Sequence, residues 1–230
     1  MSKAKKKNQN SARKRQMKAL KARRKQLAKK KHAARWGAFS SHGVMASVRG
    51  ARRLPIFECL INEDWREEGL AHIIVARKAS ENMMSFGVYL VDIYCMGVKN
   101  AFCNVNQGLT RYAALKQRLH RGHALVPCPA ELAHQIVYGA LDYAAGLGFR
   151  PHKDFAQSQW FLEPRENVPP NDTLEFGRNG KPFYVSGPDD NVARILAHLE
   201  RKVGTGNYDL LVEADAPDAY GGRAITRRLP

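Results

Sequence analysis

The chain has 230 residues, 44% of them hydrophobic, and 38 Lys and Arg against 21 Asp and Glu. An apolar share of this size can fill a core, so the composition excludes a chain that is disordered throughout. The longest apolar runs are strand-sized and far shorter than the roughly 20 residues of a membrane span, which argues against an integral membrane protein.

The positive charge is concentrated at one end of the chain. Residues 1–53 contain 19 Lys and Arg and no Asp or Glu, whereas residues 54–230 contain the other 19 basic residues and all 21 acidic ones. The first part therefore carries +19 and the second −2. Such asymmetry is typical of a chain in which one part binds a polyanion.

The cysteines and the N-terminus indicate the compartment. The four cysteines have no CxxC spacing, and the N-terminus lacks the apolar segment of a secretory signal. We therefore expect reduced thiols and a cytoplasmic protein, associated through its basic part with the nucleoid or the ribosome.

Residues 1–35 form a basic arm of low complexity. Its Ala, Lys, Arg, Gln and Leu residues favour a helix, but like charges four residues apart, such as Lys14 and Lys18, oppose that helix in water. We expect an arm that is disordered alone and folds in part on its partner.

The partner predicted for the arm is DNA or RNA, bound through phosphates without sequence preference. Basic side chains that neutralise phosphates release counterions, so many of them together give strong and salt-sensitive binding. A solubilising tail, a transport signal, a mitochondrial presequence and attachment to an anionic membrane surface remain open alternatives. The residues predicted to contact phosphates are Lys5, Lys6, Lys7, Arg13, Lys14, Arg15, Lys18, Lys21, Arg23, Arg24, Lys25, Lys29, Lys30, Lys31 and Arg35.

The arm is followed by a predicted linker, residues 36–53, a single domain over residues 54–213 and a polar tail over residues 214–230. In the linker, Trp36 and Phe39 either stack on a base or dock on the domain.

The stretch Leu70 to Phe102 predicts a hairpin at the centre of a sheet. Ala71 to Ala79 and Met83 to Met96 are rich in β-branched and aromatic residues, and Ser80 to Asn82 supply a polar turn. Both alternating sets of side chains in the second strand are apolar, so we expect both faces of the sheet to be covered.

The elements after this hairpin are mixed. Gly97 to Asn106 is predicted as a bend, and Phe155 to Leu162 as a strand. The predicted helices cover Thr110 to Arg121, Pro129 to Gly146, and Val192 to Val203. Further predictions are a second hairpin over residues 174–185, which turns at Asn179-Gly180, and a last strand from Tyr208 to Glu213.

Because strands and helices do not alternate strictly, the fold class predicted is α+β. The expected architecture is a mostly antiparallel sheet built on the central hairpin, with about three packed helices.

No standard catalytic motif is present, and the strongest candidate pair is Asp92 and Lys99 in VDIYCMGVK. An Asp among apolar strand residues is unfavourable unless it is paired or faces a pocket, and beside a Lys it suits a site that acts on a phosphodiester. The alternative is a structural Asp bonded to backbone or to Lys99. The nuclease pattern PD-(D/E)xK requires a carboxylate two residues before the Lys, and this chain has Gly97 at that position. The mismatch favours the structural role for Asp92.

Two other constellations are weaker candidates. His134 shares a helix face with Tyr138 and Asp142 and is a candidate base, although a polar helix stripe explains the spacing equally well. The second weak candidate is a zinc site built from Cys and His side chains. The alternative is that these cysteines are ordinary buried thiols of the core. The candidate zinc ligands are Cys95, Cys103, His120, His123 and Cys128. No cofactor is predicted.

Four segments, ECLINEDW, GLAHIIVAR, FGVYLVDIYCMGVKNAF and FGRNGKPFYVSGPDDN, resemble a conserved bacterial protein family of uncharacterised function. The resemblance covers residues 55–203 and excludes the arm. It implies no activity, so no functional residue is carried over.

The leading hypothesis is a non-enzymatic nucleic-acid-binding protein whose neutral domain serves a second interaction, for which another protein is the candidate partner. One alternative is an enzyme acting on nucleic acid or nucleotides, with Asp92 and Lys99 in a pocket. The other is a ribosome-associated or assembly protein, which would use the arm in the same way.

Overall fold

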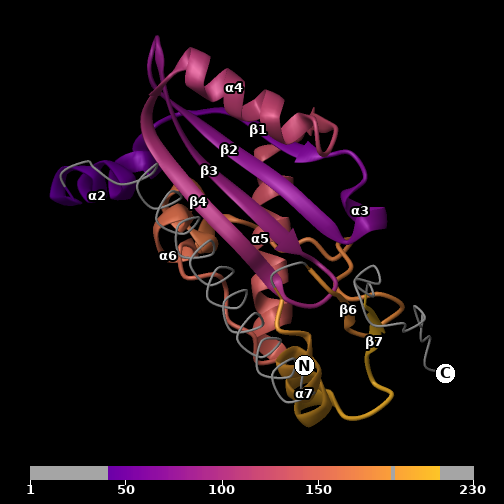
Figure 1. The fold of residues 1–230 in the computed structure, drawn as a ribbon. Coiled ribbons are helices and arrows are strands. Elements are labelled where there is room, and N and C mark those ends of the chain that lie inside the picture. The colour runs from indigo at the N-terminus through magenta and orange to yellow at the C-terminus, as the bar shows by residue number, and fades with distance from the viewer. Residues whose placement is uncertain (1–40, 188–189, 213–230) are drawn as a thin grey trace, which may run out of the picture. The chain divides into compact units, whose positions relative to one another are not determined.

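The structure is a computed structural model that describes residues 41–187 and 190–212 (Figure 1). The chain divides into two compact units, residues 1–44 and 45–230, and the fold described below is that of the second. The predicted arm, residues 1–35, and the predicted tail, residues 214–230, lie outside the described residues.

A five-stranded antiparallel sheet is the centre of the second unit, which confirms the α+β class (Figure 1). Its spatial order is β4-β3-β2-β1-β5. The strands are β1 (Ile56–Asn62), β2 (Leu70–Ser80), β3 (Met83–Asp92), β4 (Gly97–Gly108) and β5 (Leu125–Pro127). The predicted central hairpin is β2–β3, in which Ile74 pairs with Val88.

Helices cover both faces of this sheet, as the apolar pattern of β3 predicts. One face packs against α5 (Ala130–Gly146) and contributes Ile73, Val75 and Tyr89 to a large core cluster. The other face, with Ile74 and Phe86, packs against Tyr112 and Leu115 of α4 (Leu109–His120). Successive strand residues point to opposite faces, so a strand buried on both sides is apolar at every position.

A smaller substructure follows α5. Strands β6 (Phe183–Val185) and β7 (Asp209–Leu211) pair in parallel, and α7 (Val192–Val203) joins them. Ile195 and Leu199 of α7 pack with Tyr184, Cys95 and Leu147 in a third core cluster. The N-cap of α7 is Asn191, whose side-chain oxygen accepts a hydrogen bond from the backbone N–H of Arg194.

The predicted bend at Gly97 to Asn106 is wrong, because these residues belong to β4. Its Asn residues have low β propensity, but the strand pairs with β3 along most of its length. The turn between β3 and β4 is residues 93–96, so the second strand of the hairpin ends at Asp92 rather than at Met96.

The predicted strand at Phe155 to Leu162 is also wrong. Helix α6 (Phe155–Ser158) and a 3-10 turn η2 (Gln159–Phe161) occupy it, and Phe155 and Leu162 insert into the large core cluster. The predicted hairpin over residues 174–185 reduces to its turn, with one bridge between Arg178 and Lys181, because Phe183–Val185 pairs with β7 instead.

Several short elements have no counterpart in the prediction. Helix α2 (Ser41–Gly50) and the turn η1 (Ala51–Arg53) lie in the predicted linker, and Val48 and Ala51 are buried. The packed unit therefore begins before Leu54. The others are α3 (Trp65–Glu68), η3 (Arg165–Asn167) and β5. Within the described ranges, no helix combines the length and the apolarity needed to cross a membrane.

Candidate functional site

Asp92 lies at the end of β3, where its side chain holds the turn into β4. The residue is 4% exposed, and Oδ1 accepts hydrogen bonds from the backbone N–H groups of Tyr94 and Cys95, both at 2.9 Å. Burial raises the pKa of this carboxyl, although the charge of Lys99 and the backbone donors oppose the shift. The contacts of Asp92 are those of a turn-stabilising residue.

Lys99 pairs with a different carboxylate. Its Nζ lies 2.9 Å from Oδ2 of Asp190, and both side chains are mostly buried. The same oxygen accepts hydrogen bonds from Tyr184 Oη at 3.1 Å and from the Gly187 N–H at 2.8 Å. This pair ties the first residues of β4 to the segment that precedes α7.

His134 is buried in α5 and is 1% exposed. Its Nδ1 contacts the carbonyl oxygen of Ala130, and its Nε2 has no hydrogen-bond partner among the described residues. Burial lowers its pKa. The two residues that share its predicted face bond elsewhere, Tyr138 to the carbonyl oxygen of Glu163 and Asp142 to Arg165. No acid–base pair forms along this face.

The five candidate zinc ligands do not converge. Cys95 belongs to the core cluster around α7, Cys103 lies on β4, and His120 ends α4. Over the described ranges, no group of three or more His, Cys, Asp or Glu side chains is arranged to hold a metal ion. Burial raises the pKa of Cys103 to about 12 and that of Cys128 to about 11, so both remain thiols at neutral pH.

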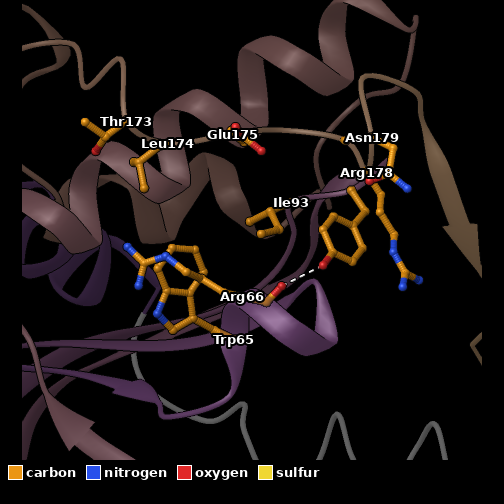
Figure 2. Close-up of a pocket in the computed structure, with 10 residues that line it drawn as sticks. Trp65, Arg66, Ile93, Thr173, Leu174, Glu175, Arg178 and Asn179 are labelled. Atoms are coloured by element: carbon orange, nitrogen blue, oxygen red, sulfur yellow. Dashed lines mark hydrogen bonds between the residues drawn. The ribbon is translucent and has the colours of Figure 1, made fainter.

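A cavity of about 450 Å³ lies between α3, the β3–β4 turn and the loop at residues 173–179 (Figure 2). Its volume is in the range of small-molecule sites. The apolar part of its lining comes from Trp65, Ile93 and Leu174. Tyr94, from the β3–β4 turn, also lines the cavity and donates a hydrogen bond from Oη to the carbonyl oxygen of Arg66 at 2.6 Å, which fixes the turn against α3.

Two arginines line this cavity from separate sides (Figure 2). The guanidinium of Arg66 lies 4.1 Å from the ring centre of Trp65, and that of Arg178 lies 4.9 Å from the ring centre of Phe183. Neither arginine forms an ion pair within the described ranges, and neither does Glu175, which also lines the cavity. The lining therefore offers both charges and aromatic surface to a ligand.

Of the side chains that can act as nucleophile or general acid–base, the cavity lining holds Glu175, Tyr94 and Thr173. The one hydroxyl of a Ser or Thr on its lining, that of Thr173, donates to Oδ1 of Asn171 at 2.6 Å. The lining contains no His or Cys. The sequence prediction missed this cavity, because its lining comes from three segments that are far apart in the chain.

The candidate residues thus have separate environments. Asp92 bonds to the backbone of the β3–β4 turn, Lys99 bonds to Asp190, and His134 is buried in α5. The predicted phosphate-contacting residues of the arm all lie outside the described residues.

Comparison with known proteins adds no identification. No family model matches the chain, and no curated protein or solved structure does so either.

Proposed function

We propose that this protein binds nucleic acid through its basic arm, residues 1–35. The observation that carries the proposal is the charge distribution, +19 over residues 1–53 against −2 over residues 54–230. A chain segment with this density of Lys and Arg and no carboxylate has phosphate polyanions as its natural partner.

The environments of the candidate catalytic residues support binding over catalysis. Asp92 is occupied by backbone donors, and Lys99 by Asp190. A catalytic pair needs its groups within reach of a substrate and of each other. An enzyme acting on nucleic acid is therefore the less supported alternative.

The experiment compares the full chain with an arm variant in which all 16 Lys and Arg of residues 1–35 are replaced by Gln. Substitution is preferable to truncation at Leu54, since truncation would remove Val48 and Ala51 from the core. Gel-shift or fluorescence-anisotropy titrations with single-stranded and duplex DNA and RNA, at several salt concentrations, give the affinity and its salt dependence.

We expect the wild type to show a steep fall of log K with log salt, and the arm variant to lose most of that slope. The matched control is a shuffled arm with unchanged composition. It should retain both affinity and slope, because phosphate contacts do not depend on the order of the charges. Equal slopes for the wild type and the Gln variant would refute the proposal.

Whether the bound nucleic acid is DNA or RNA is determined in a separate measurement. Sequencing the nucleic acid that co-purifies with the protein at low salt distinguishes genomic DNA from ribosomal RNA. Enrichment of ribosomal RNA would favour a ribosome-associated or assembly protein, whose arm makes the same phosphate contacts.

A further inference from the structure

Helix α4, together with its C-cap residue Arg121, carries a row of exposed arginines and no acidic residue. Arg111, Arg118 and Arg121 are exposed, and the sequence from 109 to 130 contains no Asp or Glu. At a rise of about 1.5 Å per residue, these three residues fall within about 15 Å along the helix axis. The net charge of residues 54–230 is only −2, although α4 is locally basic.

The row lies on one side of the helix. Lys116 marks the other side, because its Nζ contacts Oε1 of Glu58 on β1 at 2.7 Å. At about 100° per residue, Arg111 and Arg118 are roughly 140° and 160° around the helix from Lys116. They therefore project from the side of α4 opposite Lys116 and its partner Glu58 on β1.

These guanidiniums are available to a partner. None of the three forms an ion pair with a carboxylate in the part of the chain that the structure describes. Two carboxylates near α4 or the turn that follows it have side-chain partners of their own. Glu58 is held by Lys116, and Glu68 lies 3.6 Å from Nδ1 of His123.

Helix α7 provides the comparison within the same protein. Arg194 and Arg201 are exposed and have the same seven-residue spacing as Arg111 and Arg118. However, Glu200 stands next to Arg201 in the sequence. Helix α7 therefore has the same arginine spacing with a carboxylate beside it, whereas α4 contains no carboxylate.

We propose that the arginine row of α4, Arg111, Arg118 and Arg121, is a second phosphate-contacting surface. It acts on the same nucleic acid as the arm, so the inference rests on the proposed function. Duplex DNA carries one charge per about 1.7 Å of its axis, so several phosphates lie within the span of the row. Contacts from a folded helix, added to those of the arm, give the bound strand a fixed position against the protein.

The experiment uses the full chain and two matched double variants, R111Q/R118Q and R194Q/R201Q. Each removes two exposed helical arginines at the same spacing. Affinity for single-stranded and duplex DNA and RNA of one sequence is measured over a series of salt concentrations. Urea unfolding of both variants checks that the fold is intact. Vesicles containing anionic lipid serve as a competing polyanion.

We expect R111Q/R118Q to weaken binding on the order of tenfold and to reduce the log–log salt slope by about 1.5, since each lost phosphate contact removes nearly one unit. R194Q/R201Q should change neither quantity appreciably. If both double variants behave alike, or if the slope of R111Q/R118Q equals that of the wild type, the inference is wrong.

The two proposals fail in distinguishable ways. If the arm variant loses its salt dependence but R111Q/R118Q binds like the wild type, only the inference about α4 fails. If the wild type binds no nucleic acid, or binds only the anionic vesicles, both are refuted.

Discussion

Arg77 and Glu163 form an ion pair in which Nη2 of the arginine lies 2.6 Å from Oε1 of the glutamate. The arginine is 1% exposed and sits in the central strand β2. Its other N–H groups donate to the carbonyl oxygens of Phe161, Arg52 and Leu54, at 2.9, 3.1 and 2.7 Å. One side chain thus joins β2 to the turn before β1 and to the end of η2.

Replacing Arg77 by Met should destabilise the protein by about 3 kcal/mol, because three carbonyl oxygens, that of Phe161 buried and those of Arg52 and Leu54 partly buried, lose a charged donor. Glu163→Gln is the milder control, at about 1 kcal/mol or less, since the carboxylate is 37% exposed and retains water. Urea unfolding measures the loss of stability of both variants, provided that their m-values equal that of the wild type. A loss below 1 kcal/mol for Arg77→Met would mean that the network contributes little to stability.

The network also shows what sequence patterns can and cannot reveal. The pairing of β2 with β3 follows from local apolarity on both faces. The role of Arg77 depends on partners 23 to 86 residues away, which no local pattern specifies. β4 was missed for a related reason, because Asn100 and Asn104 have low β propensity and pairing with β3 supplies the stabilisation.

Among the elements that carry candidate sites, helix boundaries were predicted well, because local periodicity and capping set them. The predicted helix from Thr110 to Arg121 differs from α4 by one residue at each end, so the arginine row could have been identified from its spacing. The cavity beside Trp65 could not, since its lining combines three segments separated by about 30 to 110 residues.

Gly97, the first residue of β4, allows the strand to approach α5. Its φ is +66°, and a Cβ there would lie 2.7 Å from Cβ of Ala144 and 2.8 Å from the carbonyl oxygen of Ala140. Gly97→Ala should therefore cost about 2 kcal/mol or more, through both backbone strain and overlap with the helix.

The matched control for this change is Gly146→Ala in α5, where an added Cβ meets nothing within 4 Å. Because Ala is the better helix former, this variant should be more stable by about 0.5 to 1 kcal/mol. Thermal unfolding of both variants compares them directly. If Gly97→Ala were as stable as the wild type, β4 would have to be free to move away from α5.

Lys99 and Asp190 connect β4 to the α7 substructure, and a double-mutant cycle can measure that connection. Burial alone would raise the pKa of Asp190, but the Lys99 ammonium and the Gly187 N–H reverse that effect and lower it. Lys99→Met leaves a mostly buried carboxylate with two neutral donors, so we expect a loss of about 2 kcal/mol.

Asp190→Asn should cost about 1 to 2 kcal/mol, and the double variant less than the sum, with a coupling energy of about 1 to 2 kcal/mol. The same variants test the enzyme alternative. If Lys99→Met abolished a nuclease or nucleotidase activity while leaving stability unchanged, Lys99 would be catalytic and its role in linking β4 to α7 secondary.

Because the pKa of His72 is lowered in the folded protein, we expect the free energy of unfolding to decrease on acidification. Its ring stacks on that of His123 with centroids 3.9 Å apart, and burial, together with the charge of His123, lowers the pKa of His72 to about 4. The unfolded chain, with a pKa near 6.5, therefore binds more protons than the folded protein between these values. Since stability rises with pH wherever the unfolded state holds more protons, it must fall as the pH drops from about 6.5 to about 4.

His72→Gln removes this titration and should flatten the pH profile of unfolding between pH 6.5 and 4. Urea unfolding at half-unit pH intervals compares the variant with the wild type. His152→Gln, which lies outside the stack, is the matched control. His134 also has a pKa lowered by burial, and it contributes a slope of the same sign that remains in every variant. Parallel profiles for the wild type and His72→Gln would show that the stack does not couple protonation to folding.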